Sequence, residues 1–368
     1  MQPLSEAELS EAIRDAGGPL VVRGGGTRPI GRPVAGAALS VTGISGIRLY
    51  EPGALTLVAA AGTPVAEVEA ELAGAGQRLP FEPMNHRGIL GTEGAPTLGG
   101  MVAANASGPR RVQAGACRDS LIGVRFVDGT GAVVKNGGRV MKNVTGYDLV
   151  KLMAGSWGTL GVLSEVAFKL LPRPETEATL VLDGLDDARA VAAMSAALGS
   201  PFEVTGAAHL PDGRTVLRQE GFTASVAYRA GALAEHLAAF GTPRRLEADD
   251  STALWAGVRD VAAFHGATGD VWRVSVKPSD APGLVARARG KALYDWGGGL
   301  VWLLLPEGID LRNQLGQFSG HATLIRASTQ TRARIPTFHP EADAIAALSA
   351  GLRRRFDPRG ILNPGLME

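Results

Sequence analysis

The hydrophobic and polar positions at the start of the chain predict one helix, several short strands and a second helix. Ser5 and Glu8 have the spacing of a capping box in front of an apolar helical face, so we expect the chain to open with a helix. Short runs of β-favouring residues follow at 19–22, 39–41, 47–50 and 55–60. Pro64 then predicts the first turn of a helix that ends near Gly76. The pattern is that of an α+β fold.

A second pattern begins after an apolar alternating run that stops at Pro172 and Pro174. From residue 176 the order is β-α-β-β-α, and apolar strands then continue an antiparallel sheet with one face covered by helices. The expected helices and strands lie at 186–198, near 202–208, near 224–228, near 231–240, and near 271–276 and 300–305. We therefore expect a first domain over 1–174, a small antiparallel α+β cap over 175–335, and a C-terminal helix and tail over 336–368 that return to the first domain.

Composition and charge restrict the classes of partner and compartment. The chain has 37 basic and 36 acidic residues and a formal net charge of +1, so no overall field favours nucleic acid or an anionic membrane. Its single cysteine, Cys117, cannot form an internal disulfide or hold an iron–sulfur cluster. The N-terminus lacks the pattern of a secretory signal, and the longest apolar runs are far below the roughly 18 residues that indicate a membrane span. We expect a cytoplasmic protein that reaches the inner face of a membrane only through partner subunits.

Three segments of the first half combine glycine with other small residues, and they lie at 24–26, 96–105 and 155–162. Consecutive glycines after a strand let backbone N–H groups point into one concavity that binds phosphate, although one such run is equally a tight surface turn. The second segment predicts a short helix whose first turn offers free N–H groups. Two such anion sites on one domain predict a pyrophosphate site, and the third segment adds exposed backbone immediately before a strand. The first does not match G-x-G-x-x-G, which argues against a nicotinamide-type Rossmann domain.

The order of five short motifs carries a family resemblance. The motifs are RGGGT at 23–27, PTLGG at 96–100, RDSLIG at 118–123, GSWGTLGV at 155–162 and DPRGILNPG at 357–365. In this order they resemble FAD-binding proteins of the vanillyl-alcohol oxidase type over nearly the whole chain. Within that group, KNVTGYDL at 142–149, followed by GSWGTLGV, is most similar to the E subunits of bacterial glycolate oxidase.

The resemblance implies an FAD-binding domain of two α+β subdomains, with the flavin between this domain and the cap. The implied cofactor-binding residues are Arg23, Gly24, Gly25, Gly26, Thr27, Pro96, Thr97, Leu98, Gly99, Gly100, Ala103, Gly158, Gly161, Val162 and Asn363. Relatives that attach the flavin covalently have a histidine or cysteine in the first two glycine segments. This chain has Thr27 and Ala95 there, so the resemblance implies non-covalent FAD.

The resemblance also implies an activity and partners. The chain would be the FAD-binding subunit of a glycolate oxidase or dehydrogenase complex that oxidises glycolate, and also D-lactate, to the 2-oxo acid. Its partners would be a larger FAD-binding D-type subunit and an iron–sulfur F-type subunit that receives the electrons. Two other interpretations stay open: a self-sufficient FAD-dependent 2-hydroxy-acid dehydrogenase, and a non-catalytic structural subunit with a vestigial flavin fold.

The sequence indicates only weak candidates for catalysis. Oxidation of a hydroxy acid needs a base for the hydroxyl proton and a cation for the carboxylate. Arg326 and Arg273, on predicted strands, are candidates for the cation, although solvated strand arginines are the commoner case. Tyr147 and His339 are candidates for the base, although a packed tyrosine is the plainer interpretation. The histidines of the second half lack metal-ligand spacing, so we expect no metal site; they are His209, His236, His265, His321 and His339.

Overall fold

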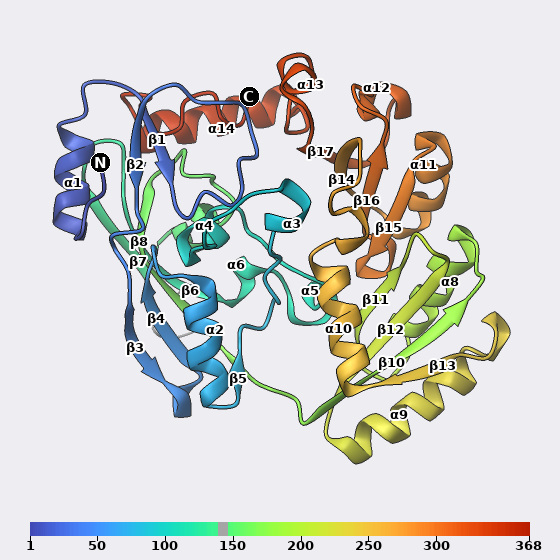
Figure 1. The fold of residues 1–368 in the computed structure, drawn as a ribbon. Coiled ribbons are helices and arrows are strands. Elements are labelled where there is room, and N and C mark those ends of the chain that lie inside the picture. The colour runs from blue at the N-terminus through green and yellow to red at the C-terminus, as the bar shows by residue number, and fades with distance from the viewer. Residues whose placement is uncertain (139–145) are drawn as a thin grey trace.

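The computed structural model describes residues 1–138 and 146–368, which form two halves that lie side by side (Figure 1). The first half is built on a five-stranded sheet and the second on an eight-stranded sheet. The second sheet begins at Thr176, which supports our proposal of a boundary between first domain and cap near residue 174. In the two described ranges, no helix is both long and apolar enough to cross a membrane.

The sheet of the first half is antiparallel throughout, and its strand order is β3–β4–β8–β6–β7. These strands are β3 (Ile47–Glu51), β4 (Thr56–Ala60), β6 (Leu121–Val127), β7 (Val133–Gly137) and β8 (Val162–Lys169). Two small sheets flank it: parallel β1 (Leu20–Arg23) with β2 (Ala37–Ser40), and antiparallel β5 (Gln77–Arg78) with β9 (Leu171–Pro172). The helices are α1 (Glu6–Arg14), α2 (Val65–Gly74), α3 (Arg87–Leu90), α4 (Leu98–Ala103), α5 (Arg111–Ala114), α6 (Cys117–Ser120) and α7 (Leu149–Met153), with a 3₁₀ turn at Pro52–Ala54.

Local chemistry explains why the first helix begins where it does. The backbone N–H of Glu8 donates to Oγ of Ser5 at 3.2 Å, and the carboxylate of Glu8 accepts from the N–H of Leu4 at 2.9 Å. These two bonds satisfy donors that a helix start would otherwise leave free. The expected opening helix and its Ser5 cap are therefore confirmed, but the capping box is incomplete because the Glu8 carboxylate accepts from Leu4, one residue before the cap.

The sheet of the cap has the order β13–β10–β12–β11–β15–β16–β14–β17. Its strands are β10 (Thr176–Asp183), β11 (Val204–His209), β12 (Arg214–Gly221), β13 (Arg244–Glu247), β14 (Asp270–Val276), β15 (Lys291–Asp295), β16 (Leu300–Leu305) and β17 (Gly320–Arg326). Its helices are α8 (Asp187–Leu198), α9 (Thr223–His236), α10 (Ala248–Arg259), α11 (Ala281–Ala288) and α12 (Leu311–Leu315), with 3₁₀ turns η2 (Ala238–Phe240), η3 (Ala262–Phe264), η4 (Pro278–Asp280) and η5 (Trp296–Gly298).

The predicted β-α-β-β-α order is confirmed, but one strand and one helix were misplaced. Residues 224–228 belong to α9, and the strand that precedes them, β12, ends at Gly221. α9 also ends at His236 instead of continuing to residue 240. Val226, Ala230 and Leu233 are buried at a spacing of four and three residues, so a helical face packs here and outweighs the local alternation.

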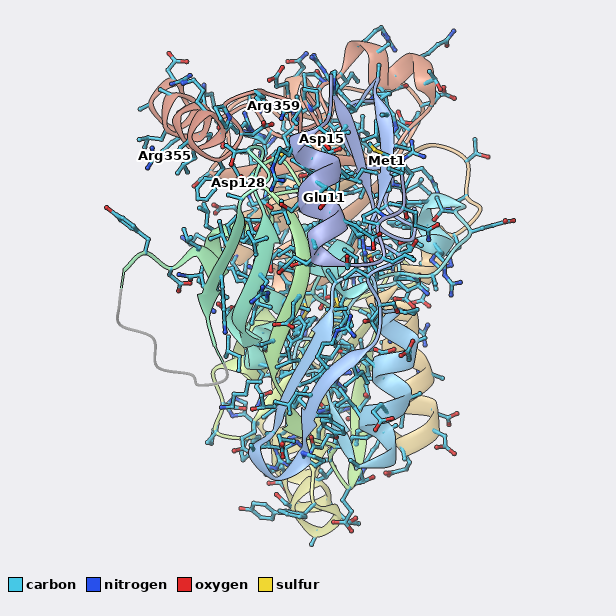
Figure 2. The ribbon with its side chains drawn as sticks, turned by 90° about the vertical axis from the view of Figure 1, so that its left-hand side faces the viewer. Met1, Glu11, Asp15, Asp128, Arg355 and Arg359 are labelled. Atoms are coloured by element: carbon cyan, nitrogen blue, oxygen red, sulfur yellow. The ribbon has the colours of Figure 1, made fainter. Side chains whose placement is uncertain are left out.

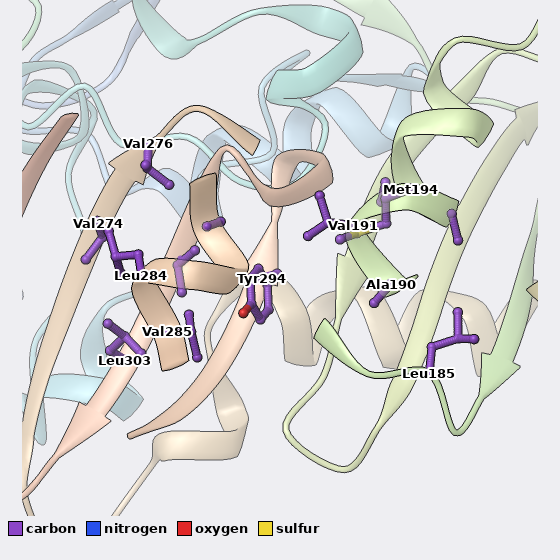
Figure 3. Close-up of a cluster of buried hydrophobic side chains, with 14 of the residues drawn as sticks. Leu185, Ala190, Val191, Met194, Val274, Val276, Leu284, Val285, Tyr294 and Leu303 are labelled. Carbon is purple, nitrogen blue, oxygen red and sulfur yellow. The ribbon is translucent and has the colours of Figure 1, made fainter. Parts of the chain in front are cut away.

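Both faces of the cap sheet are covered, which corrects the expectation of one covered face. Trp272 and Val274 of β14 pack into a core formed with α8, α9, α11 and α12, part of which Figure 3 shows. Val271, on the opposite face of the same strand, packs with Trp255 of α10. Arg273 shares this second face because side chains alternate along a strand. This second face is turned toward the first half.

The chain returns to the first half through α13 (Thr329–Arg334), α14 (Asp343–Phe356) and the tail. Leu362 pairs in parallel with Leu20 of β1, and the N–H of Asn363 donates to the carbonyl of Leu20 at 3.0 Å. Nη1 of Arg359 donates to the carbonyl of Arg14 at 2.8 Å, beside the end of α1 (Figure 2). The first strand of the chain and its last residues are therefore neighbours.

A buried network of charges joins the two halves. Arg218 of the cap bonds Glu82 of the first half at 2.9 Å, and Glu220 of the cap accepts from Arg110 at 2.7 Å and Arg78 at 2.6 Å. Burial raises the pKa of Glu220, but the guanidinium groups of Arg218 and Arg110 lower it more, so the net pKa is lowered. The group is therefore ionised, and its ion pairs hold the halves together.

Candidate functional site

A cavity of about 450 Å³ lies between the three glycine-rich segments, and we call it the glycine cavity. Most of the residues predicted to bind a cofactor line it: Arg23, Gly24, Gly25, Gly26, Thr27, Thr97, Gly99, Gly100, Ala103, Gly158, Gly161, Val162 and Asn363. The structure thus brings together segments that are far apart in the sequence. Their contact with a cofactor stays a prediction.

Two of the predicted residues do not line the glycine cavity. Leu98 is fully buried in the core of the first half, and its N–H donates to the carbonyl of Thr63 at 3.0 Å. Pro96 is bonded to the start of α2, where its carbonyl accepts from the N–H of Val65 at 2.8 Å. Both residues therefore position the segment and do not contribute to the cavity wall.

The first glycine segment is glycine because another backbone lies against it. A Cβ on Gly25 would lie 1.6 Å from the carbonyl oxygen of Ala95, and one on Gly24 would lie 2.3 Å from Oγ1 of Thr97. No side chain fits at either position. The first and second glycine segments therefore form adjoining walls of one cavity.

The turn that follows β1 leaves backbone donors free. Within residues 1–138 and 146–368, the N–H groups of Gly24, Gly25, Gly26 and Thr27 have no acceptor. All four residues line the glycine cavity. Free N–H groups in a concave wall are suited to phosphate oxygens, so the first segment keeps its predicted role as an anion-binding turn.

The second segment was predicted to offer free N–H groups, and this prediction is wrong. The N–H of Gly99 donates to the carbonyl of Ala61 at 2.7 Å, and the N–H of Gly100 donates to Oγ1 of Thr97 at 3.3 Å. The helix that they open, α4, has only six residues. Its first turn is bonded within the protein, so it supplies close packing and a small-residue surface to the cavity.

The third segment is fixed by the C-terminal tail. Oδ1 of Asn363 accepts from the N–H of Val22 at 2.8 Å, and its Nδ2 donates to the carbonyl of Trp157 at 2.9 Å. The amide of Asn363 therefore ties β1 to the segment that contains Trp157. Its side chain positions two walls of the glycine cavity, and its predicted contact with a flavin remains a prediction.

Arg28 is a cation of the glycine cavity that the sequence did not single out. Its Nε donates to Nδ1 of His86 at 3.0 Å and its Nη2 to the carbonyl of Met84 at 3.0 Å, while Nη1 has no partner among the described residues. Burial lowers the pKa of Arg28 to about 10, so the group is charged at neutral pH. No carboxylate of the described chain pairs with it. The cavity thus holds a positive charge that an anionic ligand would neutralise.

A larger cavity of about 1090 Å³ lies between the halves, and we call it the arginine cavity. Ile30 and Trp157 line both cavities, so the two adjoin. Its walls carry Arg111 and Arg273, with the aromatic rings of Trp296, Trp302 and Phe338 and the imidazoles of His86, His321 and His339. A cavity with aromatic walls and convergent polar groups is typical of a small-molecule site.

The imidazoles of the arginine cavity differ in which ring nitrogens already have a hydrogen-bond partner. Nδ1 of His86 accepts from Arg28, and Nδ1 of His339 accepts from the N–H of Ala322 at 3.3 Å. Neither ring nitrogen of His321 has a partner in the described part of the chain. Burial, and next the positive charge of Arg273, lower the pKa of His321, so it is neutral near pH 7 and free to accept a proton.

Two of the four catalytic candidates do not face the arginine cavity. Arg326 donates to the carbonyls of Phe264 and Ile89 at 2.8 and 3.2 Å and to other backbone oxygens, so its guanidinium braces loops instead of binding a substrate. Tyr147 is 88% exposed at the surface, where it cannot act as a base in a shielded site. Arg273 and His339 do line the cavity. Residues 142–145 of the motif that precedes Tyr147 lie outside the described residues.

The residues that sequence reasoning missed are single side chains without a local pattern. Arg28 had one usable signal, because it directly follows the glycine run. Arg111, Trp296 and His86 had none, since their roles arise only where the halves meet. His321 was considered, but only as a surface or core histidine.

In the described ranges, no group of three or more histidine, cysteine, aspartate or glutamate side chains is arranged to hold a metal ion. The absence of a metal site stays a prediction. The thiol of Cys117 is fully buried, and burial raises its pKa, so it is not a reactive group of either cavity.

Comparisons with known proteins agree with this geometry. Residues 1–137 match the family described as an FAD binding domain. The glycolate oxidase subunit GlcE of Escherichia coli (strain K12) is 35% identical over 98% of this chain and 95% of that subunit. The glycolate oxidase subunit GlcD of Bacillus subtilis (strain 168) is 44% identical over 23% of this chain and 18% of that subunit.

A solved structure of alkyldihydroxyacetonephosphate synthase has a TM-score of 0.70, with 15% identity over 99% of this chain and 75% of that chain. The fold class is therefore confirmed as the FAD-binding fold of the vanillyl-alcohol oxidase type.

The glycine cavity fits FAD. Its free N–H groups at Gly24 to Thr27 and its unpaired Arg28 suit anionic oxygens, and Val22, Val162 and Leu163 give it apolar surface for rings.

Proposed function

The chain belongs to the family of the glycolate oxidase subunit GlcE, and from this premise we propose that it is an FAD-binding subunit of a complex that oxidises small 2-hydroxy acids such as glycolate. The observation that carries the proposal is the glycine cavity, whose free N–H groups and unpaired Arg28 adjoin a second, substrate-sized cavity. An uncompensated buried cation beside free backbone donors lowers stability, so its presence favours a bound anion over a vestigial fold.

Residues of the first half would hold the cofactor. The turn from Gly24 to Thr27 would bind phosphate oxygens through its N–H groups, and Arg28 would neutralise negative charge. Gly99 and Gly100 would give the cofactor close access to α4. FAD, when bound, supplies a two-electron acceptor for oxidation of an alcohol.

The cofactor would be held without a covalent bond. No described residue that lines the glycine cavity is a histidine, cysteine or tyrosine. Thr27 lines it, and a threonine hydroxyl does not supply the imidazole or thiol that such bonds use. Flavin should therefore leave the protein on acid precipitation.

The arginine cavity would hold the hydroxy acid. The rings of Trp296, Trp302 and Phe338 give it apolar walls, and it adjoins the glycine cavity at Ile30 and Trp157. His321 would accept the hydroxyl proton, because its ring is neutral and both of its nitrogens lack partners among the described residues.

An exposed apolar stripe supports a role as one subunit of a complex. α14 has no buried residue, and Ile345, Leu348 and Leu352 are 51%, 67% and 40% exposed on it. They are spaced by three and four residues, so they share a helical face. An unpartnered apolar face of this kind is typical of a protein contact. We propose that it packs against a partner subunit, the larger FAD-binding D-type or the iron–sulfur F-type subunit.

The test is the visible spectrum of the purified chain, before and after anaerobic addition of glycolate and of D-lactate, with and without the partner subunits. The proposal expects bound flavin, released by acid, that bleaches with glycolate when the partners are present. Bleaching of the chain alone would favour a self-sufficient dehydrogenase, which the substrate-sized cavity of this chain also supports. A chain that neither holds nor takes up FAD would overturn the proposal and leave a structural subunit.

A further inference from the structure

Three arginines line the arginine cavity, Arg111, Arg273 and Arg353, and the first two lie against one aromatic ring. Arg111 comes from α5 of the first half and Arg273 from β14 of the cap. Within residues 1–138 and 146–368, neither guanidinium makes an ion pair or a hydrogen bond. The interface arginine Arg218, in contrast, is bonded to Glu82 through two nitrogens, at 3.0 and 2.9 Å. Two unpaired cations on one cavity wall indicate that an anion comes from outside the chain.

Both guanidinium groups lie on the same aromatic ring. The central carbon of Arg111 is 4.5 Å from the centroid of Trp296, and that of Arg273 is 5.2 Å from it. Cation–π contacts of this kind hold a guanidinium in place without using its N–H groups. The N–H donors of both arginines therefore remain available to a ligand.

The ring itself is fixed by both halves of the protein. Nε1 of Trp296 donates to the carbonyl of Gly108 in the first half at 3.0 Å, and its backbone N–H donates to Oδ1 of Asp295 at 2.7 Å. The two arginines thus keep a set separation as long as the halves stay docked. A site made of side chains locked in this way is preorganised for its ligand.

The two cations destabilise one another, which strengthens the case for an anionic ligand. Burial, and next the charge of Arg111, lower the pKa of Arg273 to about 10. Asp295 opposes this effect, but burial raises the pKa of Asp295 itself to about 7, so its carboxyl is only partly ionised near neutral pH. Asp119 acts on Arg111 through its charge, and Glu341 and Glu368 also line the cavity, but within the described residues none of these carboxylates forms an ion pair with Arg111 or Arg273.

We propose that Arg111 and Arg273 together bind the carboxylate of the substrate. The identity of the substrate as a 2-hydroxy acid rests on the proposed function. Guanidinium groups match the planar, bidentate geometry of a carboxylate, and they bind it more strongly than a neutral amide. An acid anchored at this pair stays in the cavity that adjoins the cofactor-binding cavity at Ile30 and Trp157.

Calorimetric titration of the purified chain, with FAD added and without it, tests this assignment. The probes are oxalate, a carboxylate that has no hydroxyl carbon to oxidise, and oxamide, its neutral diamide. The variants are Arg111→Gln and Arg273→Gln, with Arg273→Lys as a version that keeps the charge. Arg245→Gln is the matched control, because Arg245 is exposed on β13 at the far edge of the cap sheet.

The wild-type chain and Arg245→Gln should prefer oxalate to oxamide. Each glutamine variant should lose about 10- to 100-fold in oxalate affinity and lose most of this preference, because a charge-assisted contact is removed. Arg273→Lys should retain part of the preference. Loss of fold is recognised by the melting temperature. Arg111 is only partly buried, on a four-residue helix with no buried residue, so its variant should disturb the fold less than Arg273→Gln and keeps the test decisive.

Unchanged oxalate binding in both glutamine variants would overturn the assignment, and so would a wild-type chain that does not discriminate oxalate from oxamide. The proposed function has a separate point of failure, which is FAD binding. A chain that prefers oxalate but holds no FAD would support the anion site and overturn the proposed function.

Discussion

Nε of Arg28 donates to Nδ1 of His86 at 3.0 Å, and this bond joins the wall of the glycine cavity to the wall of the arginine cavity. Because Nδ1 accepts, the proton of the neutral imidazole lies on Nε2. Burial, and next the charge of Arg28, lower the pKa of His86 well below its usual value, so the ring stays neutral at physiological pH. The imidazole thereby orients the guanidinium without neutralising its charge.

Replacing Arg28 should weaken flavin binding. We expect Arg28→Gln to lose about 10- to 100-fold in FAD affinity, because glutamine keeps part of the hydrogen bonding but none of the charge. Quenching of flavin fluorescence on titration with the protein measures the affinity. Arg48→Gln, at an exposed position of β3, is the control and should bind FAD like the wild-type chain. Equal affinity in both variants would show that Arg28 does not face the cofactor.

Adding one methyl group at Gly25 should destroy the glycine cavity. A Cβ there would lie 1.6 Å from the carbonyl oxygen of Ala95, so the two glycine segments must separate. Gly25→Ala should therefore be purified without flavin and with a lower melting temperature. Gly53→Ala is the matched control, since a Cβ at Gly53 meets nothing within 4 Å. Normal flavin content in Gly25→Ala would contradict the packing described.

The buried carboxyl of Asp295 should make the stability of the chain depend on pH. Burial raises its pKa from 3.8 to about 7. Between these values the folded chain keeps a proton that the unfolded chain releases, so stability falls as pH rises through this window. Asp295→Asn removes this titration but keeps an oxygen for the N–H of Trp296. The melting temperature of the variant minus that of the wild type should increase from pH 5 to pH 8, and an equal difference at both pH values would refute the assignment.

Removing one charge from the network between the halves should be costly. Glu220→Gln leaves Arg78 and Arg110 without their common carboxylate in a buried site. We expect the free energy of unfolding to fall by about 3 kcal/mol, measured by urea denaturation. Glu203→Gln breaks the pair with Arg229, but the Glu203 side chain is 72% exposed, so this control should change stability little. Equal effects of the two variants would argue against a buried network.

The stripe on α14 should matter for assembly and not for folding. Leu348→Glu and Leu352→Glu place charges on an exposed face, so melting temperature and flavin content should stay unchanged. Co-purification of partner subunits should decrease, because a charge in an apolar contact is desolvated without a partner. Tyr228→Glu, on the exposed surface of α9, is the control and should co-purify normally. Undiminished co-purification of both leucine variants would place the contact elsewhere.

The sequence pattern located the glycine cavity because the backbone conformation of its walls requires glycine at particular positions. Gly24 and Gly25 had to be glycine, and their run was visible without any structure. The free donors expected at Gly99 and Gly100 did not exist, because Ala61 and Thr97 accept their hydrogen bonds and only the folded chain shows this.

The residues that line the arginine cavity form almost no recognisable pattern in the sequence. Arg111 and Trp296 are separated by about half of the chain, and each is an ordinary residue in its own segment. Their relationship depends on how the first half meets the cap, which no periodicity encodes. Arg326 shows the converse error, because a strand arginine looked available while neighbouring carbonyls satisfied its donors.

The pairing of Leu20 with Leu362 has a consequence for how the protein is made. β1 is translated more than 300 residues before Leu362, which bridges to it, and before Asn363, whose amide ties β1 to the Trp157 segment. Until then one wall of the glycine cavity is missing. A chain that stalls before residue 363 therefore lacks the bonds that join β1 to the Trp157 segment, and its glycine cavity is incomplete.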